Sequence, residues 1–235
     1  ARMAEGGFID TAEVARAAAV PVSAKRLALP AFAAHLAQQA RRLHPGAGYH
    51  QVTLSRARQR ALELVATESA RQLGPGLSVA IMLADAHTGQ VLAEVGSAGL
   101  LDVRRAGWID MIGVPRSPGS ALKPFIYALA LEDGLVLPET LIEDRPASFD
   151  GYRPRNFDLT YQGDVSVRQA LQLSLNVPAV RLLQSTVPSR LLGRLRRAGV
   201  APILPRNKAP GLAIGLGGVG VTLKDLVQAY TVFAN

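Results

Sequence analysis

Apolar residues recur at helical spacing in the first part of this chain. An alanine-rich stretch within residues 1–20 predicts one or two short helices. The same spacing returns over residues 54–73, and the Gly-Pro-Gly of residues 74–76 ends it. Residues 21–53 mix helix-forming residues with prolines and glycines, which indicates a linker between the two helical segments.

The period of the pattern changes after residue 76. Residues 77–84 and 90–95 are apolar runs on either side of a turn-like segment at residues 85–89, so they predict a β-hairpin. The first run is apolar enough to lie inside a sheet. Beyond Pro138 the pattern is mostly helical and predicts no strand that would complete the sheet. We therefore expect a mixed α/β fold of the α+β type with an incomplete sheet.

Several helix starts are clear in the second half of the chain. A helix is predicted over residues 120–132, with Pro124 in its first turn, where proline is tolerated. Ser166 and Gln169 form a capping box that opens a helix through residue 173. Further helices are predicted over residues 178–186, 188–197 and 222–235.

The composition narrows the possible chemistry. Of the 235 residues, 49% are hydrophobic, so we expect a packed core. The sequence has no cysteine, which excludes disulfides and thiolate metal sites. Neither a metal nor another cofactor is expected, because the four histidines share no spacing typical of metal ligands; they are His35, His44, His50 and His87.

The formal net charge of +8 is compatible with an acidic polymer, a membrane surface or a nucleic acid as partner. Arginines cluster at residues 41–42, 56–60 and 190–197, but few aromatic residues lie among them. Because single strands bind on aromatic stacking surfaces, we interpret the clusters as solvated helix faces and expect no nucleic-acid partner. No run is apolar and long enough to be a membrane helix.

The strongest chemical pattern is Ser120-Ala-Leu-Lys123. A serine and a lysine three residues apart lie side by side on one helical turn, which pairs a nucleophile with a base, as covalent acyl transfer requires. The apolar residues 124–131 predict a buried helix, and burial lowers the pKa of a lysine toward the neutral amine that a base needs. At a helix start, the Ser120 N–H would be free to stabilise an oxyanion. The alternative is an ordinary surface helix cap.

A second pattern, Ser174-Leu-Asn176, follows downstream. One interpretation is a helix end, with Asn176 as its left-handed cap and Pro178 opening the next helix. In the functional interpretation, Ser174 joins a proton relay with Lys123 and the Asn176 amide contacts the substrate.

Residues 215–220 match the dinucleotide pattern G-x-G-x-x-G and precede a helix. A dinucleotide site also needs a preceding strand and an acidic residue about 20 positions later. The segment before the glycines is short, and the sequence ends before such an acid. We therefore interpret the glycines as a tight turn.

Residues 116–127, which contain Ser120 and Lys123, resemble the first transpeptidase motif of class A penicillin-binding proteins. The stretch that leads into the second motif is represented as well, by residues 154–158, 161–163 and 167–180. Together with residues 132–134 and 140–144, these segments look most similar to the penicillin-binding protein 1C branch.

This resemblance implies a penicillin-binding transpeptidase fold, similar to that of serine β-lactamases. It assigns residues 54–235 to the transpeptidase domain and residues 21–53 to a linker. Residues 1–20 look like the closing helices of a glycosyltransferase domain. We expect the chain to come from the middle of a bifunctional enzyme that is anchored upstream of residue 1 at the periplasmic face of the bacterial inner membrane.

The resemblance also implies the chemistry. Ser120 would attack the penultimate D-alanine of a peptidoglycan stem peptide, and Lys123 would take the serine proton. Ser174 would pass a proton to the leaving amine, while Asn176 would hold the peptide. β-Lactams would acylate Ser120, and other cell-wall synthesis proteins are possible partners.

One departure from the family is the absence of Lys-Thr-Gly, the third motif, from these 235 residues. Three of the family's five central strands would be absent with it. We expect the isolated chain to be inactive and prone to aggregation, since the apolar face of the Ser120 helix would lack a sheet to pack against. Two alternatives remain. One is a non-catalytic binding or scaffolding module. The other is a serine β-lactamase, although residues 1–60 do not resemble the N-terminal region of a β-lactamase.

Overall fold

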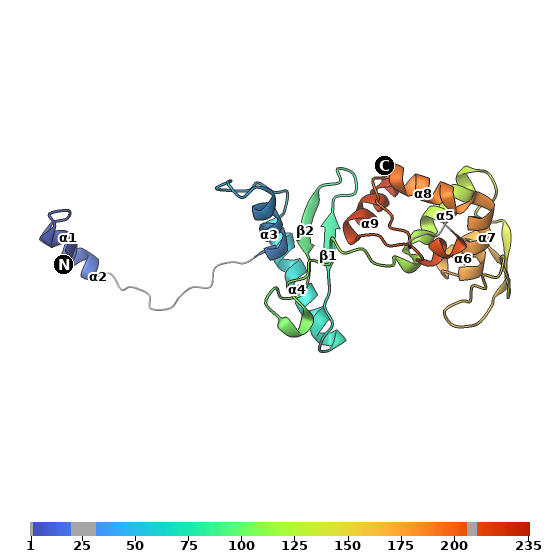
Figure 1. The fold of residues 1–235 in the computed structure, drawn as a ribbon, viewed down its shortest axis with the longest axis horizontal. Helices are drawn as coiled ribbons and strands as arrows, with labels where there is room; N and C mark the ends of the chain where they lie inside the picture. The colour runs from blue at the N-terminus through green and yellow to red at the C-terminus, as the bar shows by residue number, and fades with distance from the viewer. Residues whose placement is uncertain (1, 20–31, 206–210) are drawn as a thin grey trace. The chain divides into compact units, whose positions relative to one another are not determined.

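The structure is a computed structural model that describes residues 2–19, 32–205 and 211–235. The chain divides into two compact units at residues 31 and 32 (Figure 1). The first unit contains helices α1 (Arg2–Glu5) and α2 (Thr11–Ala19). The short helices predicted at the N-terminus are thus confirmed. None of the described helices is both long and apolar enough to span a membrane.

Helix α3 (Ala34–Leu43) lies inside the segment that was predicted to be a linker. His35 of α3 is buried, and its ring Nε2 lies 2.8 Å from the Gly107 carbonyl oxygen. Just before the helix, the Ala33 N–H donates to Glu63 Oε1 at 2.8 Å. The linker interpretation therefore needs correction for α3, because polar contacts fix it to the second unit; residues 20–31 lie outside the described residues.

The predicted hairpin is confirmed, with strands β1 (Ile81–Ala84) and β2 (Val91–Val95) paired antiparallel. Helix α4 (Arg56–Leu73) packs on β2 (Figure 1). Gln59 of α4 is buried and makes two hydrogen bonds to the backbone of Glu94, at 2.7 and 2.8 Å. This side chain satisfies the edge of β2 in place of a neighbouring strand.

A second sheet contradicts the prediction of helices alone beyond residue 138. Strands β3 (Leu141–Asp144) and β4 (Gly163–Ser166) pair antiparallel and form a two-stranded sheet. Each strand is four residues long, and only Ile142 and Val165 pack their apolar side chains into the core. So short an alternation carries no periodic signal that could be distinguished from a loop.

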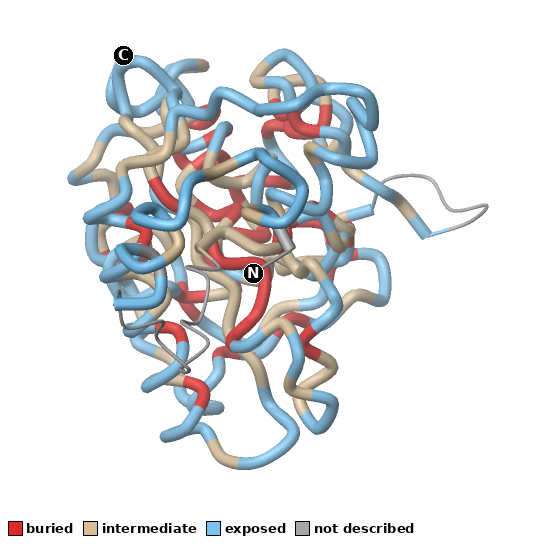
Figure 2. The backbone as a smooth tube through the Cα atoms, turned by 90° about the vertical axis from the view of Figure 1, so that its left-hand side faces the viewer, coloured by how far each residue is buried: buried red, intermediate tan, exposed pale blue. Residues whose placement is uncertain are grey.

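Packed helices supply most of the main core of the second unit, and η3, α9 and β4 add further residues. Helix α5 (Lys123–Glu132) packs against α6 (Val167–Gln172), α7 (Asn176–Thr186) and α8 (Pro188–Arg197) (Figure 1). The buried positions are marked in red in Figure 2. The buried side chains of α5 thus pack on helices, while the expected inactivity and aggregation of the isolated chain stay predictions.

The prediction that Ser120 is the first residue of this helix is wrong. Ser120 lies in a 3-10 turn, η2 (Gly119–Leu122), that leads into α5. Pro124 follows at the start of α5, where a missing N–H costs no helical hydrogen bond. The Ser166 capping box predicted for α6 is confirmed, with both reciprocal hydrogen bonds present.

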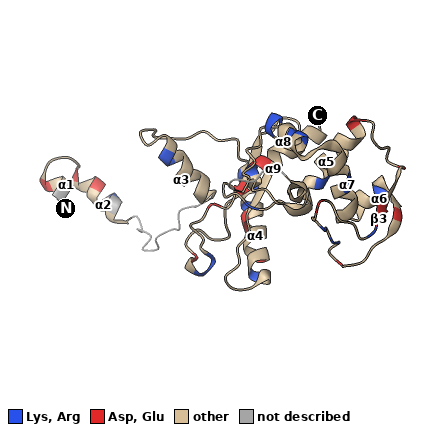
Figure 3. Cartoon of the chain, turned by 45° about the vertical axis from the view of Figure 1, so that its right-hand side comes forward, with Lys and Arg blue, Asp and Glu red and all other residues tan. Residues whose placement is uncertain are grey.

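Lys and Arg residues occur on several elements of the described chain. Figure 3 shows them spread over α3, α4 and α8. On α8, Arg190 pairs with Asp133 and Arg194 pairs with Glu132, so two of the clustered arginines fasten α8 to the C-terminal end of α5. These contacts give the arginines a packing role between helices.

The C-terminal part contains η3 (Leu212–Leu216), α9 (Leu223–Tyr230) and η4 (Thr231–Phe233), while η1 (Val103–Arg105) lies in the loop after the hairpin. Thr222 caps α9, since its hydroxyl accepts the Asp225 N–H at 3.0 Å. The predicted helix to residue 235 was too long, because the chain passes into a 3-10 turn at Thr231.

The glycines of residues 215–220 allow close packing. A Cβ on Gly215 would lie 2.7 Å from Leu183 Cδ2 and 3.0 Å from Ile126 Cδ1. Gly217 has a φ of 95°, which favours glycine, and its carbonyl oxygen accepts the Ser117 hydroxyl at 2.8 Å. The glycines therefore bring η3 against α5, α7 and the loop before Ser120.

Gly215→Ala should lower the free energy of unfolding by about 1–3 kcal/mol, because the added methyl group overlaps two buried side chains. Gly113→Ala is the matched control, since no atom lies within 4 Å of its added Cβ. Denaturant unfolding of both variants measures the difference. Equal stability of the two would contradict the close packing.

Candidate active site

Lys123 is the first residue of α5, and only 1% of its surface is exposed. Burial lowers the pKa of the Lys123 amine from 10.5 to about 8, because leaving water disfavours the charged form. The sequence predicted this desolvation from the apolar residues that follow. The amine is therefore poised between its charged and neutral forms near neutral pH.

Three acceptors surround the Lys123 amine. Nζ lies 2.6 Å from Asn176 Oδ1 and 3.1 Å from Ser174 Oγ, and it also donates to the Ser174 carbonyl oxygen. A neutral amine has two N–H donors and one lone pair. The amide and carbonyl oxygens can only accept, so they take the two donors and leave the lone pair to the Ser174 hydroxyl. Ser174 is thus the group placed to exchange a proton with Lys123.

The backbone at Ser174 explains why two of its oxygens reach the amine. Ser174 has a φ of 54°, in the left-handed region. Its N–H donates to the Leu171 carbonyl at 3.0 Å, and the Leu175 N–H donates to the Ala170 carbonyl at 3.0 Å. This is the Schellman ending of α6, with serine where glycine is usual. The left-handed cap predicted at Asn176 is wrong, because it lies at Ser174.

Asn176 instead begins α7. Its Nδ2 donates to the Arg155 carbonyl oxygen at 2.6 Å, which leaves Oδ1 facing Lys123. Its backbone N–H donates to Asn156 Oδ1 at 2.8 Å. Asn176 is thus fixed at both ends and links the loop before β4 to the lysine.

Ser120 is exposed in η2, and among the described residues its hydroxyl makes no hydrogen bond to Lys123. The amine is turned away toward the junction of α6 and α7, where its three acceptors lie. Ser120 and Lys123 are therefore neighbours along the backbone, as predicted, but their side chains are not within hydrogen-bond distance of each other. Such contacts in unliganded sites often tighten only when substrate binds.

A cavity of about 480 Å³ joins three of the four predicted site residues. Ser120, Ser174 and Asn176 line it, and Lys123 lies beneath them through its hydrogen bonds. The remaining lining residues are Asn156, Phe157, Asp158, Gln162, Leu173 and Leu175. Sequence reasoning assigned no individual role to these six residues, although all of them lie in the segments that resemble the family, residues 154–158, 161–163 and 167–180.

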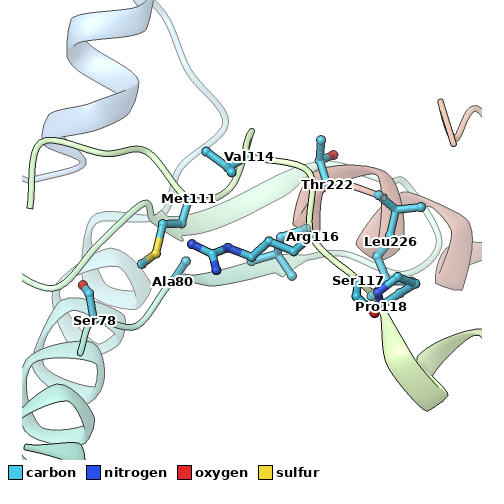
Figure 4. A pocket seen from close by; sticks show the side chains of 11 residues that line it. Ser78, Ala80, Met111, Val114, Arg116, Ser117, Pro118, Thr222 and Leu226 are labelled. Carbon is cyan, nitrogen blue, oxygen red and sulfur yellow. The ribbon is translucent and has the colours of Figure 1, made fainter. Parts of the chain in front are cut away.

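A separate cavity of about 400 Å³ lies beside the hairpin and α9 (Figure 4). In Figure 4 the Arg116 side chain extends along it toward Met111 and Ala80. None of the four predicted site residues lines this cavity. Residues 116–118 nevertheless connect it to the turn that carries Ser120.

No group of three or more His, Asp or Glu side chains in the described ranges could hold a metal ion. The larger cavity offers the hydroxyl, amine and amide groups just described, together with backbone N–H groups.

Residues 79–235 match the family described as the penicillin binding protein transpeptidase domain. The chain belongs to this family. It is 43% identical over 183 residues to penicillin-binding protein 1C of Escherichia coli, an alignment that covers 78% of this chain and 24% of that protein. It is also 34% identical to penicillin-binding protein 1A of Neisseria gonorrhoeae, over 68% of this chain and 20% of that one. The chain thus spans a quarter or less of these relatives, and the predicted family resemblance is confirmed.

Solved structures confirm the predicted fold. The penicillin-binding protein PonA1 from Mycobacterium tuberculosis superposes with a TM-score of 0.70 at 21% identity, covering 86% of this chain and 56% of that chain. Penicillin-binding protein 1A from Haemophilus influenzae superposes with a TM-score of 0.59 at 27% identity, covering 68% and 24%. The mixed fold of this chain is therefore that of penicillin-binding transpeptidases.

The strained backbone at Ser174 gives a direct stability test. Ser174→Gly should be about 1 kcal/mol more stable than Ser174→Ala, because a side chain disfavours the left-handed conformation. Both variants lack the hydroxyl, so their difference in thermal unfolding reports the backbone alone. A glycine variant no more stable than the alanine variant would contradict the strain.

Proposed function

We propose that this chain carries the acyl-transfer site of a peptidoglycan D,D-transpeptidase that works through a serine acyl-enzyme. The observation that supports this best is the buried Lys123 amine, with a pKa lowered to about 8 and with Ser174 and Asn176 as partners, under a cavity that Ser120 also lines. A nucleophile, a base and a proton carrier thus share one site.

In the first step, the Ser120 oxygen attacks the carbonyl carbon of the penultimate D-alanine of a stem peptide. The serine proton goes to the neutral Lys123 amine, and a proton reaches the leaving D-alanine nitrogen through the Ser174 hydroxyl, 3.1 Å from Nζ. A carbon–oxygen ester bond forms, and the peptide carbon–nitrogen bond breaks. The Ser120 N–H, at the start of a 3-10 turn, stabilises the developing oxyanion.

In the second step, the amine of another stem peptide attacks the ester carbon. The new peptide bond forms the cross-link and the ester carbon–oxygen bond breaks. The proton that the attacking amine loses passes to the departing Ser120 oxygen. Asn176 has a second amide N–H besides the one donated to Arg155, and this donor holds the bound peptide.

β-Lactams are the second class of ligand in this proposal, because their strained amide resembles the end of the stem peptide. A PonA1 structure from Mycobacterium tuberculosis contains penicillin V, and its fold superposes on this chain with a TM-score of 0.66. We further infer that the complete protein also has a glycosyltransferase domain, lies at the periplasmic face of the inner membrane and works with other cell-wall synthesis proteins.

Ser120→Ala should abolish covalent labelling of the complete gene product by penicillin, because no oxygen remains to form the ester. Intact mass measured after incubation gives the result. Ser185→Ala is the control, since this exposed serine on α7 bonds only to the helix carbonyl of Arg181. Labelling that survives Ser120→Ala would show that the nucleophile is another residue. No labelling of the unaltered protein would favour a non-catalytic binding module.

The acylation rate should rise with pH through about 8 and level off above it, because only the neutral Lys123 amine can accept the serine proton. Lys123→Arg, which stays charged, should lower the rate by about 10²–10⁴-fold at every pH. Lys224→Arg, on an exposed lysine of α9, should leave the profile unchanged. A flat profile from pH 6 to 10 would contradict the role of Lys123 as base.

A further inference from the structure

A buried carboxylate lies behind the site. Asp144, the last residue of β3, has no exposed surface, and no Lys, Arg or His pairs with it among the described residues. Its oxygens accept Asn156 Nδ2 at 2.9 Å each and the Gln162 N–H at 2.8 Å. Burying a charge without a cation is costly unless such donors compensate it. The buried Asp144 carboxylate is therefore stabilised by N–H donors from the loop between β3 and β4.

The hydrogen bonds to Asp144 fix the orientation of the Asn156 amide. An ionised carboxylate only accepts hydrogen bonds, so the NH₂ group of Asn156 has to face Asp144. The same NH₂ also donates to the Thr160 carbonyl oxygen at 2.9 Å. Oδ1 is then left on the opposite side, where it accepts the Asn176 N–H at 2.8 Å.

The orientation of a second side-chain amide, that of Asn176, is fixed in the same way. The Arg155 carbonyl oxygen takes the NH₂ group of Asn176 at 2.6 Å, so Asn176 Oδ1 faces Lys123 Nζ, also at 2.6 Å. Arg155 is the neighbour of Asn156 in the chain, so one loop segment sets both the backbone and the side chain of Asn176. From Asp144 to Lys123, each amide group therefore has a single orientation that satisfies its neighbours.

We propose that Asp144 and Asn156 are positioning residues for acyl transfer, which act through Asn176 to hold the Lys123 amine in place. The proposal rests on the proposed function of the site. Neither residue donates or accepts the transferred proton; their role is to keep Asn176 Oδ1 on the amine, so that the lone pair stays directed at the hydroxyl groups of the cavity.

A purely structural role would be to anchor the loop between β3 and β4. The two roles differ in the pH profile of acylation, because a displaced Lys123 amine changes that profile, whereas loss of a loop anchor alone lowers only the stability. Asp144→Asn removes the acceptor-only partner, so the Asn156 amide can turn and present NH₂ to the Asn176 N–H. Asn156→Asp places two carboxylates in contact. The double variant Asp144→Asn/Asn156→Asp again has one carboxylate and one amide, and the carboxylate at position 156 can still accept the Asn176 N–H, but it loses the hydrogen bond that Asn156 donates to the Thr160 carbonyl.

The experiment measures the penicillin acylation rate and the thermal unfolding of the complete gene product for these three variants. Asp164→Asn is the matched control, because this exposed carboxylate lies on the partner strand β4 and pairs with Arg145 outside the cavity. With the rate measured from pH 6 to 10, we expect each single variant to acylate about tenfold more slowly or worse and with a changed pH profile. We expect the double variant to recover part of the rate and of the melting temperature, and the control to match the unaltered protein.

Single variants that acylate within twofold of the unaltered protein would overturn the proposal. So would single variants that fold but keep the pH profile of the unaltered protein, or a double variant that folds and acylates no faster than the single variants. If the single variants do not fold, a folded double variant that acylates supports the proposal. If the unaltered protein is not acylated, the proposed function fails, while recovery of the melting temperature in the double variant still tests the orientation of the amides.

Discussion

The structure of this site depends on keeping a lysine amine out of water. Lys123 lies at the start of a largely buried helix of the core, where desolvation lowers its pKa to about 8. A buried amine needs polar partners, and the junction of α6 and α7 supplies them from Ser174 and Asn176. The packing of α5 against α7 is thus also what brings the two sequence motifs together.

Placing these partners around the amine requires an unfavourable backbone conformation at Ser174. Ser174 adopts a left-handed conformation that glycine would adopt more easily, and in doing so directs its carbonyl and hydroxyl oxygens at one amine. Asn176 is held through two amide orientations that begin at the buried carboxylate of Asp144. The strained backbone of Ser174 and the buried carboxylate of Asp144 thus both help to hold the groups that contact the Lys123 amine.

The parts of this arrangement that depend on neighbours in sequence could be predicted. The hairpin, the Ser166 capping box and the burial of Lys123 all follow from local patterns. The strands β3 and β4 and the roles of Asp144 and Asn156 could not, because they depend on partners 12 or more residues away. The same holds for the Ser174 conformation, since serine has no intrinsic preference for it and the α6 ending imposes it.

A crystal structure of the complete gene product after reaction with penicillin would test this account most directly. The account predicts continuous electron density from Ser120 Oγ to the opened β-lactam, with Lys123 Nζ still in contact with Ser174 and Asn176. Density for the adduct on another residue, or an unmodified Ser120 beside a lysine exposed to solvent, would contradict it.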